Sequence, residues 1–108
     1  MEIRLKSSLL VSAELRRCEG LFISGVILHR GDDERGLILI KQFVGNFGSR
    51  IYSQTRDENG VLIWHQPLGD GWLDETKADN YIARQIEFDN DLWVIEIDDP
   101  KNIYTPES

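Results

Sequence analysis

Apolar residues near the start of the chain recur every three or four positions, which is the spacing of one face of a helix. The stripe consists of Val11, Leu15 and Cys18. Ser7 or Ser8 can cap the first turn, because a serine hydroxyl accepts a hydrogen bond from a free backbone amide. The pattern therefore predicts a helix that begins at one of these serines and runs to about Glu19, where Gly20 ends it.

Four segments rich in Ile, Leu, Val and alternating polar residues follow this helix. Leu21–His29 and Gly36–Phe43 are separated by a polar turn, so they predict a hairpin. Arg50–Arg56 and Val61–His65 flank Asn59-Gly60, a pair that tolerates the positive φ of a tight turn. We therefore expect a four-stranded antiparallel meander.

A second helical pattern begins after an irregular segment. Ala78, Ile82 and Ile86 recur every four residues, and Thr76 with Asp79 has the spacing of a capping box. The sequence predicts that this helix begins at Thr76.

A final strand is expected over Leu92–Ile97, with Trp93 in the core. The order is then α-β-β-β-β-α-β, an α+β fold. We expect an antiparallel sheet of about five strands, made of the meander and this C-terminal strand, with both helices packed on one face. One domain over residues 1–108 is expected, with residues 105–108 as a frayed tail.

Composition adds limits on location and chemistry. The chain of 108 residues is 41% hydrophobic and 29% charged, as is usual for a globular domain. Its single cysteine excludes an internal disulfide, which fits a reducing cytoplasm. The N-terminus lacks the uninterrupted apolar core of a signal peptide, and no apolar run approaches the roughly 20 residues of a membrane span. We expect a cytoplasmic protein that does not bind membranes.

The formal net charge is −7, and the acidic residues gather in the second half. Residues 57–108 contain three basic and thirteen acidic residues. Phosphate contacts depend on concentrated lysine and arginine, so we expect no nucleic-acid binding. The acidic half either packs against the more basic first half or offers a face to a basic protein partner.

Carboxylates are densest around the last strand. Asp89, Asp91, Glu96 and Asp98 are hard oxygen ligands that could hold a divalent metal. The spacing matches no calcium loop, and Leu92 and Trp93 interrupt it. The alternative is structural: Asp89 and Asp91 form a polar turn, and Asp98 and Asp99 end the strand.

Few other residues could support catalysis. Cys18, His29 and His65 are the candidates for a thiol–imidazole pair. Cys18 lies on the apolar stripe, and each histidine ends a strand, so we expect structural roles. No glycine-rich phosphate loop and no nucleophile elbow is present in the sequence.

Trp72 is the candidate interaction residue. It lies between glycine-flanked turns, where a tryptophan could anchor a protein partner. Alternatively, its ring closes the end of the sheet.

Three segments carry a resemblance to a known family: Arg4–Gly20, Arg30–Asp32 and Tyr81–Asp99. Together they resemble a bacterial family of about this length, domain of unknown function 1491. Asn90 stands where a typical member has proline in the turn before the last strand. The resemblance implies a small cytoplasmic bacterial protein, and it brings no catalytic residue, cofactor or partner to this chain.

We therefore expect a small module that is not an enzyme, needs no cofactor, and acts through a protein partner or a homodimer interface. The alternative is a metal-dependent enzyme that uses Asp89, Asp91, Glu96 and Asp98.

Overall fold

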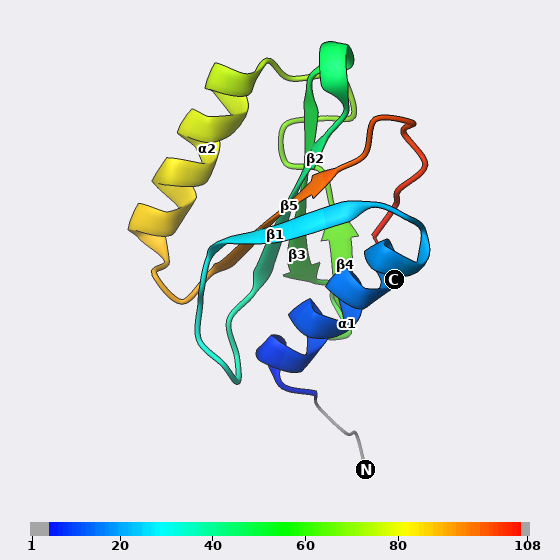
Figure 1. Cartoon of the computed structure of the whole chain (residues 1–108). Helices are drawn as coiled ribbons and strands as arrows, with labels where there is room; N and C mark the ends of the chain where they lie inside the picture. Colours follow the sequence, from blue (N-terminus) through cyan, green and yellow to red (C-terminus); the bar gives the residue numbers. More distant parts are fainter. Residues whose placement is uncertain (1–4, 107–108) are drawn as a thin grey trace.

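The computed structural model describes residues 5–106 and folds them into two α-helices, a short 3-10 helix and one five-stranded sheet (Figure 1). The helices and strands follow the predicted order. Their bounds are α1 (Ser7–Gly20), β1 (Ser24–His29), β2 (Ile38–Phe43), η1 (Gly45–Phe47), β3 (Ser49–Arg56), β4 (Leu62–His65), α2 (Glu75–Phe88) and β5 (Trp93–Asp98).

The sheet is mixed, so the prediction of a purely antiparallel sheet is wrong. The strand order is β1-β5-β2-β3-β4, and β5 runs parallel to β2. The other three pairings are antiparallel. The predicted hairpin of β1 with β2 is also wrong, because β5 lies between these two strands. Of the four strands expected in the meander, β2, β3 and β4 form it.

Burial explains why β5 takes a central position. Five of the six residues of β2 are buried, and so are four of the six in β5. Strands that are apolar on both faces need a neighbour on each side and a layer on each face. The last strand of the chain therefore inserts beside β2, and β1 becomes an edge.

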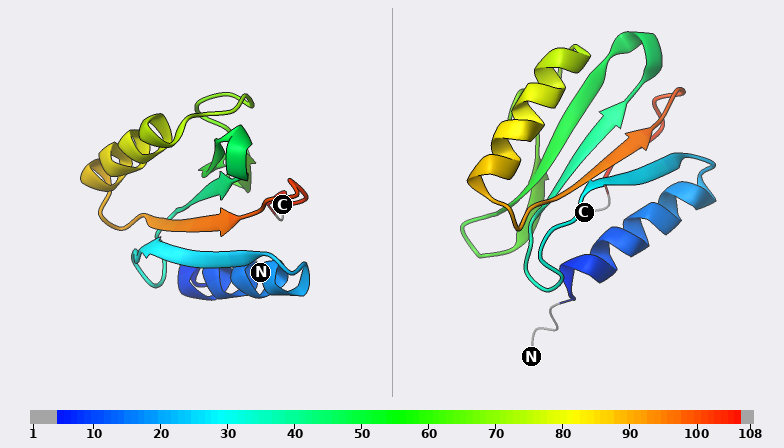
Figure 2. Two further views of the ribbon diagram at one scale, coloured as in Figure 1. Left: turned by 45° about the horizontal axis from the view of Figure 1, so that its top comes forward. Right: turned by 60° about the vertical axis from the view of Figure 1, so that its left-hand side comes forward.

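The two helices lie on opposite faces of the sheet, which corrects the prediction that both cover one face (Figure 2). Alternate residues of β2 divide between two cores, since Ile38 and Ile40 pack with α1 whereas Leu39 packs with α2. Trp93 is buried in the first core, as predicted. Each face of the central strands therefore has its own helix.

The first helix begins as predicted, but serine does not cap it. Lys6 occupies the N-cap position and provides no side-chain bond. The Ser7 hydroxyl instead donates to the Gly36 carbonyl oxygen at 2.6 Å. It therefore ties α1 to the segment before β2.

The second helix begins one residue earlier than predicted. Asp74 is the cap, and its carboxylate accepts a hydrogen bond from the Lys77 amide at 2.7 Å. Thr76 and Asp79 form no capping box, because Asp79 pairs with Lys41 of the sheet.

The hairpin of β3 and β4 is confirmed. Gly60 has φ of 79°, the positive value that its turn requires. The Asp57 carboxylate accepts hydrogen bonds from the Asn59 and Val61 amides, which stabilises the turn.

The segment after β5 returns across the sheet. Tyr104 is buried in the core beneath α1, and the Thr105 carbonyl oxygen accepts a hydrogen bond from Arg17 at 2.5 Å. Glu107 and Ser108 of the predicted frayed tail lie outside the described residues.

Candidate functional site

The edge strand β1 is apolar on both faces. Val26, Ile27 and Leu28 are each between 42% and 52% exposed, and within residues 5–106 the strand pairs on one side only, with β5. An edge strand usually carries charged residues or proline that prevent pairing with another chain. Gly20–His29 contains no charged residue and no proline. The composition of β1 is therefore that of a central strand, although it lies at the edge.

Phe22, just before β1, adds to this exposed surface. Its side chain is 99% exposed, and its backbone has φ of 59°. A bulky residue in the left-handed region is strained, and the helix end it occupies ordinarily favours glycine or asparagine. Strain together with a fully exposed aromatic ring marks Phe22 as a candidate contact residue.

A concave feature lies on the α1 face of the sheet, toward the edge formed by β4. A groove of about 340 Å³ separates α1 from the β3–β4 hairpin, with part of β2 between them. Most of its lining is apolar. The lining residues are Leu10, Ala13, Glu14, Arg17, Ile38, Ile40, Gln54, Leu62, Ile63 and Trp64.

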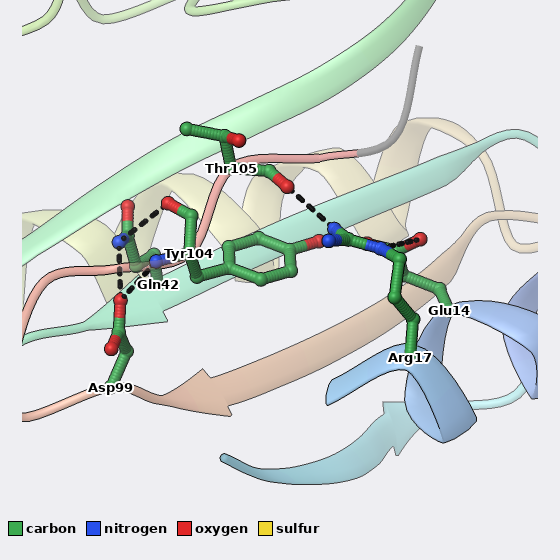
Figure 3. Close-up of polar contacts among 6 residues, drawn as sticks. All are labelled: Glu14, Arg17, Gln42, Asp99, Tyr104 and Thr105. Carbon is green, nitrogen blue, oxygen red and sulfur yellow. Dashed lines mark hydrogen bonds and ion pairs between the residues drawn. The ribbon is translucent and has the colours of Figure 1, made fainter. Parts of the chain in front are cut away.

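An ion pair and a tyrosine lie where α1 meets the C-terminal segment (Figure 3). The Tyr104 hydroxyl donates to Glu14 Oε1 at 2.6 Å, and Arg17 Nη2 contacts the same oxygen at 2.6 Å. Burial and the bond to Glu14 raise the pKa of Tyr104 well above its usual value. Tyr104 therefore stays protonated and donates this hydrogen bond at neutral pH.

A buried polar network holds the start of the C-terminal segment (Figure 3). Gln42 Nε2 donates to Asp99 Oδ2 at 2.9 Å and to the Tyr104 carbonyl oxygen at 3.2 Å. The Tyr104 amide donates to Asp99 Oδ2 at 2.8 Å, and Tyr52 donates its hydroxyl hydrogen to Gln42 Oε1. Since Gln42 and Asp99 are both buried, these bonds fix the path of the segment.

Lys41 is a buried lysine surrounded by three carboxylates. Its Nζ lies 2.6 Å from Glu75, 3.1 Å from Asp79 and 2.9 Å from Glu96. Burial alone would lower the pKa of Lys41, but the hydrogen bonds to these carboxylates outweigh it and raise the pKa above its usual value. The charged ammonium therefore joins α2 to β2 and β5.

The four acidic residues predicted as a metal alternative have separate surroundings. Asp89 accepts a hydrogen bond from the Asp91 amide within the turn before β5. Glu96 pairs with Lys41, and Asp98 is exposed at the far end of β5. Within residues 5–106, no three His, Cys, Asp or Glu side chains are grouped so that they could hold a metal ion.

The candidate thiol and imidazoles also lie apart. Cys18 is buried as predicted, and burial with the nearby Glu14 carboxylate raises its pKa to about 11. His29 and His65 end β1 and β4, which are the opposite edges of the sheet. Each ring bonds a backbone carbonyl oxygen, that of Leu92 or of Ser53.

Trp72 is partly exposed and lies in a small cluster at one end of the sheet. The Arg50 guanidinium is 3.9 Å from the centre of the Trp72 ring, and the Phe47 ring centre is 5.6 Å away. Arg50 also donates a hydrogen bond to Asn102. That Trp72 contacts a partner stays a prediction.

Comparison with known proteins identifies the family. The family model described as "Protein of unknown function (DUF1491)" matches residues 5–104. The chain belongs to this family. The resemblance inferred from the three sequence segments is thereby confirmed, and the family has no assigned function.

Solved structures of DUF1491 proteins share this fold. A crystal structure of a family protein from Caulobacter crescentus CB15 is 29% identical, with a TM-score of 0.80 and 89% of each chain covered. An NMR structure from the same bacterium is 28% identical, with a TM-score of 0.80 over 93% of this chain and 90% of that one.

A more distant similarity is to the solution structure of protein Atu0922 from A. tumefaciens. It is 21% identical, with a TM-score of 0.77 over 98% of this chain and 100% of that one, and it shows the fold alone. No curated protein matches the chain. In the described part of this DUF1491 protein, neither helix is long and apolar enough to cross a bilayer.

Proposed function

We propose that this protein is a non-enzymatic module that assembles with a second copy of itself through β1. The observation that carries the proposal is the mismatch between composition and position in this strand. Val26, Ile27 and Leu28 would suit a strand with neighbours on both sides, yet among the described residues β1 pairs with β5 alone. A second strand would cover the exposed side chains and bond the outward backbone groups.

The distribution of charge in the chain favours a second copy as the partner of β1. The chain carries −7, so two copies repel each other across most surfaces. Gly20–His29 is uncharged, so it can meet its own copy without like-charge contact and offers no charge to attract a different partner. A strand paired with its own copy also satisfies both unpaired edges with one two-fold interface.

The geometry of such pairing is restricted. In an antiparallel pair, two residues directly opposite each other point to the same face of the sheet. A two-fold axis perpendicular to the sheet also leaves each residue of the second copy on the same face as in the first. The axis therefore passes beside one residue, which lies opposite its own copy. The shift at Leu28 confines regular pairing to Ser24–Ile27. The product is a continuous sheet through both copies.

The surroundings of the chemically capable side chains support a non-enzymatic role. The Cys18 thiol is buried with a raised pKa, and the two histidines lie at opposite edges and bond to backbone. Lys41 is paired with three carboxylates. In these surroundings, the side chains contribute to the stability of the fold.

The proposal predicts the effect of a charge in β1. Val26→Lys should raise the dissociation constant of the dimer at least about tenfold, because each interface would then bury two like charges. Sedimentation velocity over a concentration series measures this constant.

Val61→Lys is the matched control. Val61 is 54% exposed and lies beside the opposite edge strand, whereas Val26 is 52% exposed. The control should associate like the unmodified chain. A chain that stays monomeric at every concentration, or equal weakening by both substitutions, would contradict the proposal.

A further inference from the structure

The groove between α1 and the β3–β4 hairpin has the size and lining of a small-molecule site. Its volume of about 340 Å³ falls within the range of roughly 300–1,000 Å³ typical of such sites. Leu10, Ile38 and Ile40 form part of its apolar wall, and half-buried Trp64 adds an aromatic surface. It lies toward β4, at the opposite edge of the sheet from β1.

Gln54 lines this groove and carries a side-chain amide of fixed orientation. Its Oε1 accepts a hydrogen bond from the Ile38 amide at 3.0 Å. Because a backbone amide can only donate, the oxygen of Gln54 must face it, and the side-chain orientation is fixed. Among residues 5–106, none accepts a hydrogen bond from Gln54 Nε2. The amide nitrogen can therefore donate to a bound molecule.

Charge in the groove limits the ligand further. Glu14 and Arg17 are the charged lining residues, and they pair with each other at 2.6 Å. Glu14 Oε1 also accepts the Tyr104 hydroxyl. Since the two lining charges cancel, a charged ligand would lose its hydration without gaining an opposite charge.

We propose that this groove binds a small uncharged molecule with an apolar body and a carbonyl-type oxygen, which accepts a hydrogen bond from Gln54 Nε2. Such a ligand matches the apolar walls, the oriented Gln54 donor and the paired charges of the lining. The site goes beyond the proposed self-association, and the two can fail independently because β1 takes no part in the groove.

Two isosteric probes test the donor. Acetophenone has a carbonyl oxygen, and alpha-methylstyrene has a methylene group in its place. Titration followed by NMR should show saturable shifts of the Gln54 side-chain amide and the Trp64 indole with acetophenone. The isostere should bind roughly three- to tenfold more weakly, as expected for the loss of one neutral hydrogen bond.

Gln54→Glu removes the hydrogen-bond donor but keeps the bond to the Ile38 amide that supports the fold. Glutamate keeps an oxygen for the Ile38 amide but has no donor at neutral pH, so the preference for acetophenone should disappear. If Gln54→Glu keeps the preference, or if the unmodified chain binds both probes equally, the inference is overturned.

Ala13→Trp tests the location. Ala13 is an exposed lining residue of α1, so an indole there fills the groove without disturbing the core. It should abolish saturable binding. Ser12→Trp, at an exposed position of α1 outside the lining, should bind acetophenone normally. Unchanged binding by Ala13→Trp, or no saturable binding by the unmodified chain, would also overturn the site.

Discussion

Tyr104→Ala is expected to lower the free energy of unfolding by about 3–5 kcal/mol, the range for removing a buried aromatic ring. Tyr104 is only 2% exposed and packs in the core beneath α1. The substitution leaves a cavity and removes a hydrogen-bond donor from Glu14. Urea unfolding followed by tryptophan fluorescence measures the loss.

Tyr104→Phe divides this effect between ring and hydroxyl. It keeps the packing and removes only the bond to Glu14, so its cost should be about 1–2 kcal/mol. Equal losses in the two variants would show that the ring adds nothing, and a loss below about 1 kcal/mol for Tyr104→Ala would contradict its place in the core.

Lys41→Met is expected to lower the free energy of unfolding by about 2–4 kcal/mol. Methionine retains most of the apolar stem, but Glu75, Asp79 and Glu96 would then face one another without a cation. The partners are partly exposed, so the loss should stay below that for a fully buried pair. Chemical denaturation at neutral pH and constant ionic strength measures it.

Lys77→Met is the matched control for this substitution. Lys77 is an exposed lysine on α2, so its replacement should leave the unfolding midpoint almost unchanged. Adding Glu96→Gln to Lys41→Met should recover part of the loss, because it removes one of the three repelling charges. No recovery would show that repulsion is not the cause.

Local patterns predicted most of the elements. The stripe of Val11 and Cys18, the turn at Asn59-Gly60 and the burial of Trp93 all follow from spacing and turn chemistry within a few residues. The capping details were wrong because Ser7 and Asp79 bond to distant residues, Gly36 and Lys41. Such bonds depend on the fold and have no local signal.

Strand order and helix placement required information that local pattern does not contain. Adjacent apolar segments favour a hairpin, but β5 competes for the same position because it is buried on both faces. Once β5 lies beside β2, its alternate side chains face opposite cores. One helix on each face then covers both.

The candidate surfaces were only partly visible in the sequence. The absence of charge from Gly20 to His29 is a signal that could have marked β1 for pairing, had its edge position been known. The groove joins residues from α1, β2, β3 and β4, so it emerges only from the tertiary arrangement. Gln54 reads as an ordinary polar strand residue until its bond to Ile38 is seen.

Cysteine cross-linking along β1 tests the central claim of self-pairing most directly. Single substitutions Ser24→Cys, Val26→Cys and Ile27→Cys would be treated with a short bifunctional thiol reagent, with Val61→Cys as control. Cys18 is buried and its raised pKa keeps the thiol unreactive, so it does not interfere. Paired strands bring opposite side chains within about 4.5–5.5 Å, so at least one β1 variant should form a covalent dimer in high yield. The control should remain monomeric, and equal yields at Val61, or no dimer at any β1 position, would contradict the account.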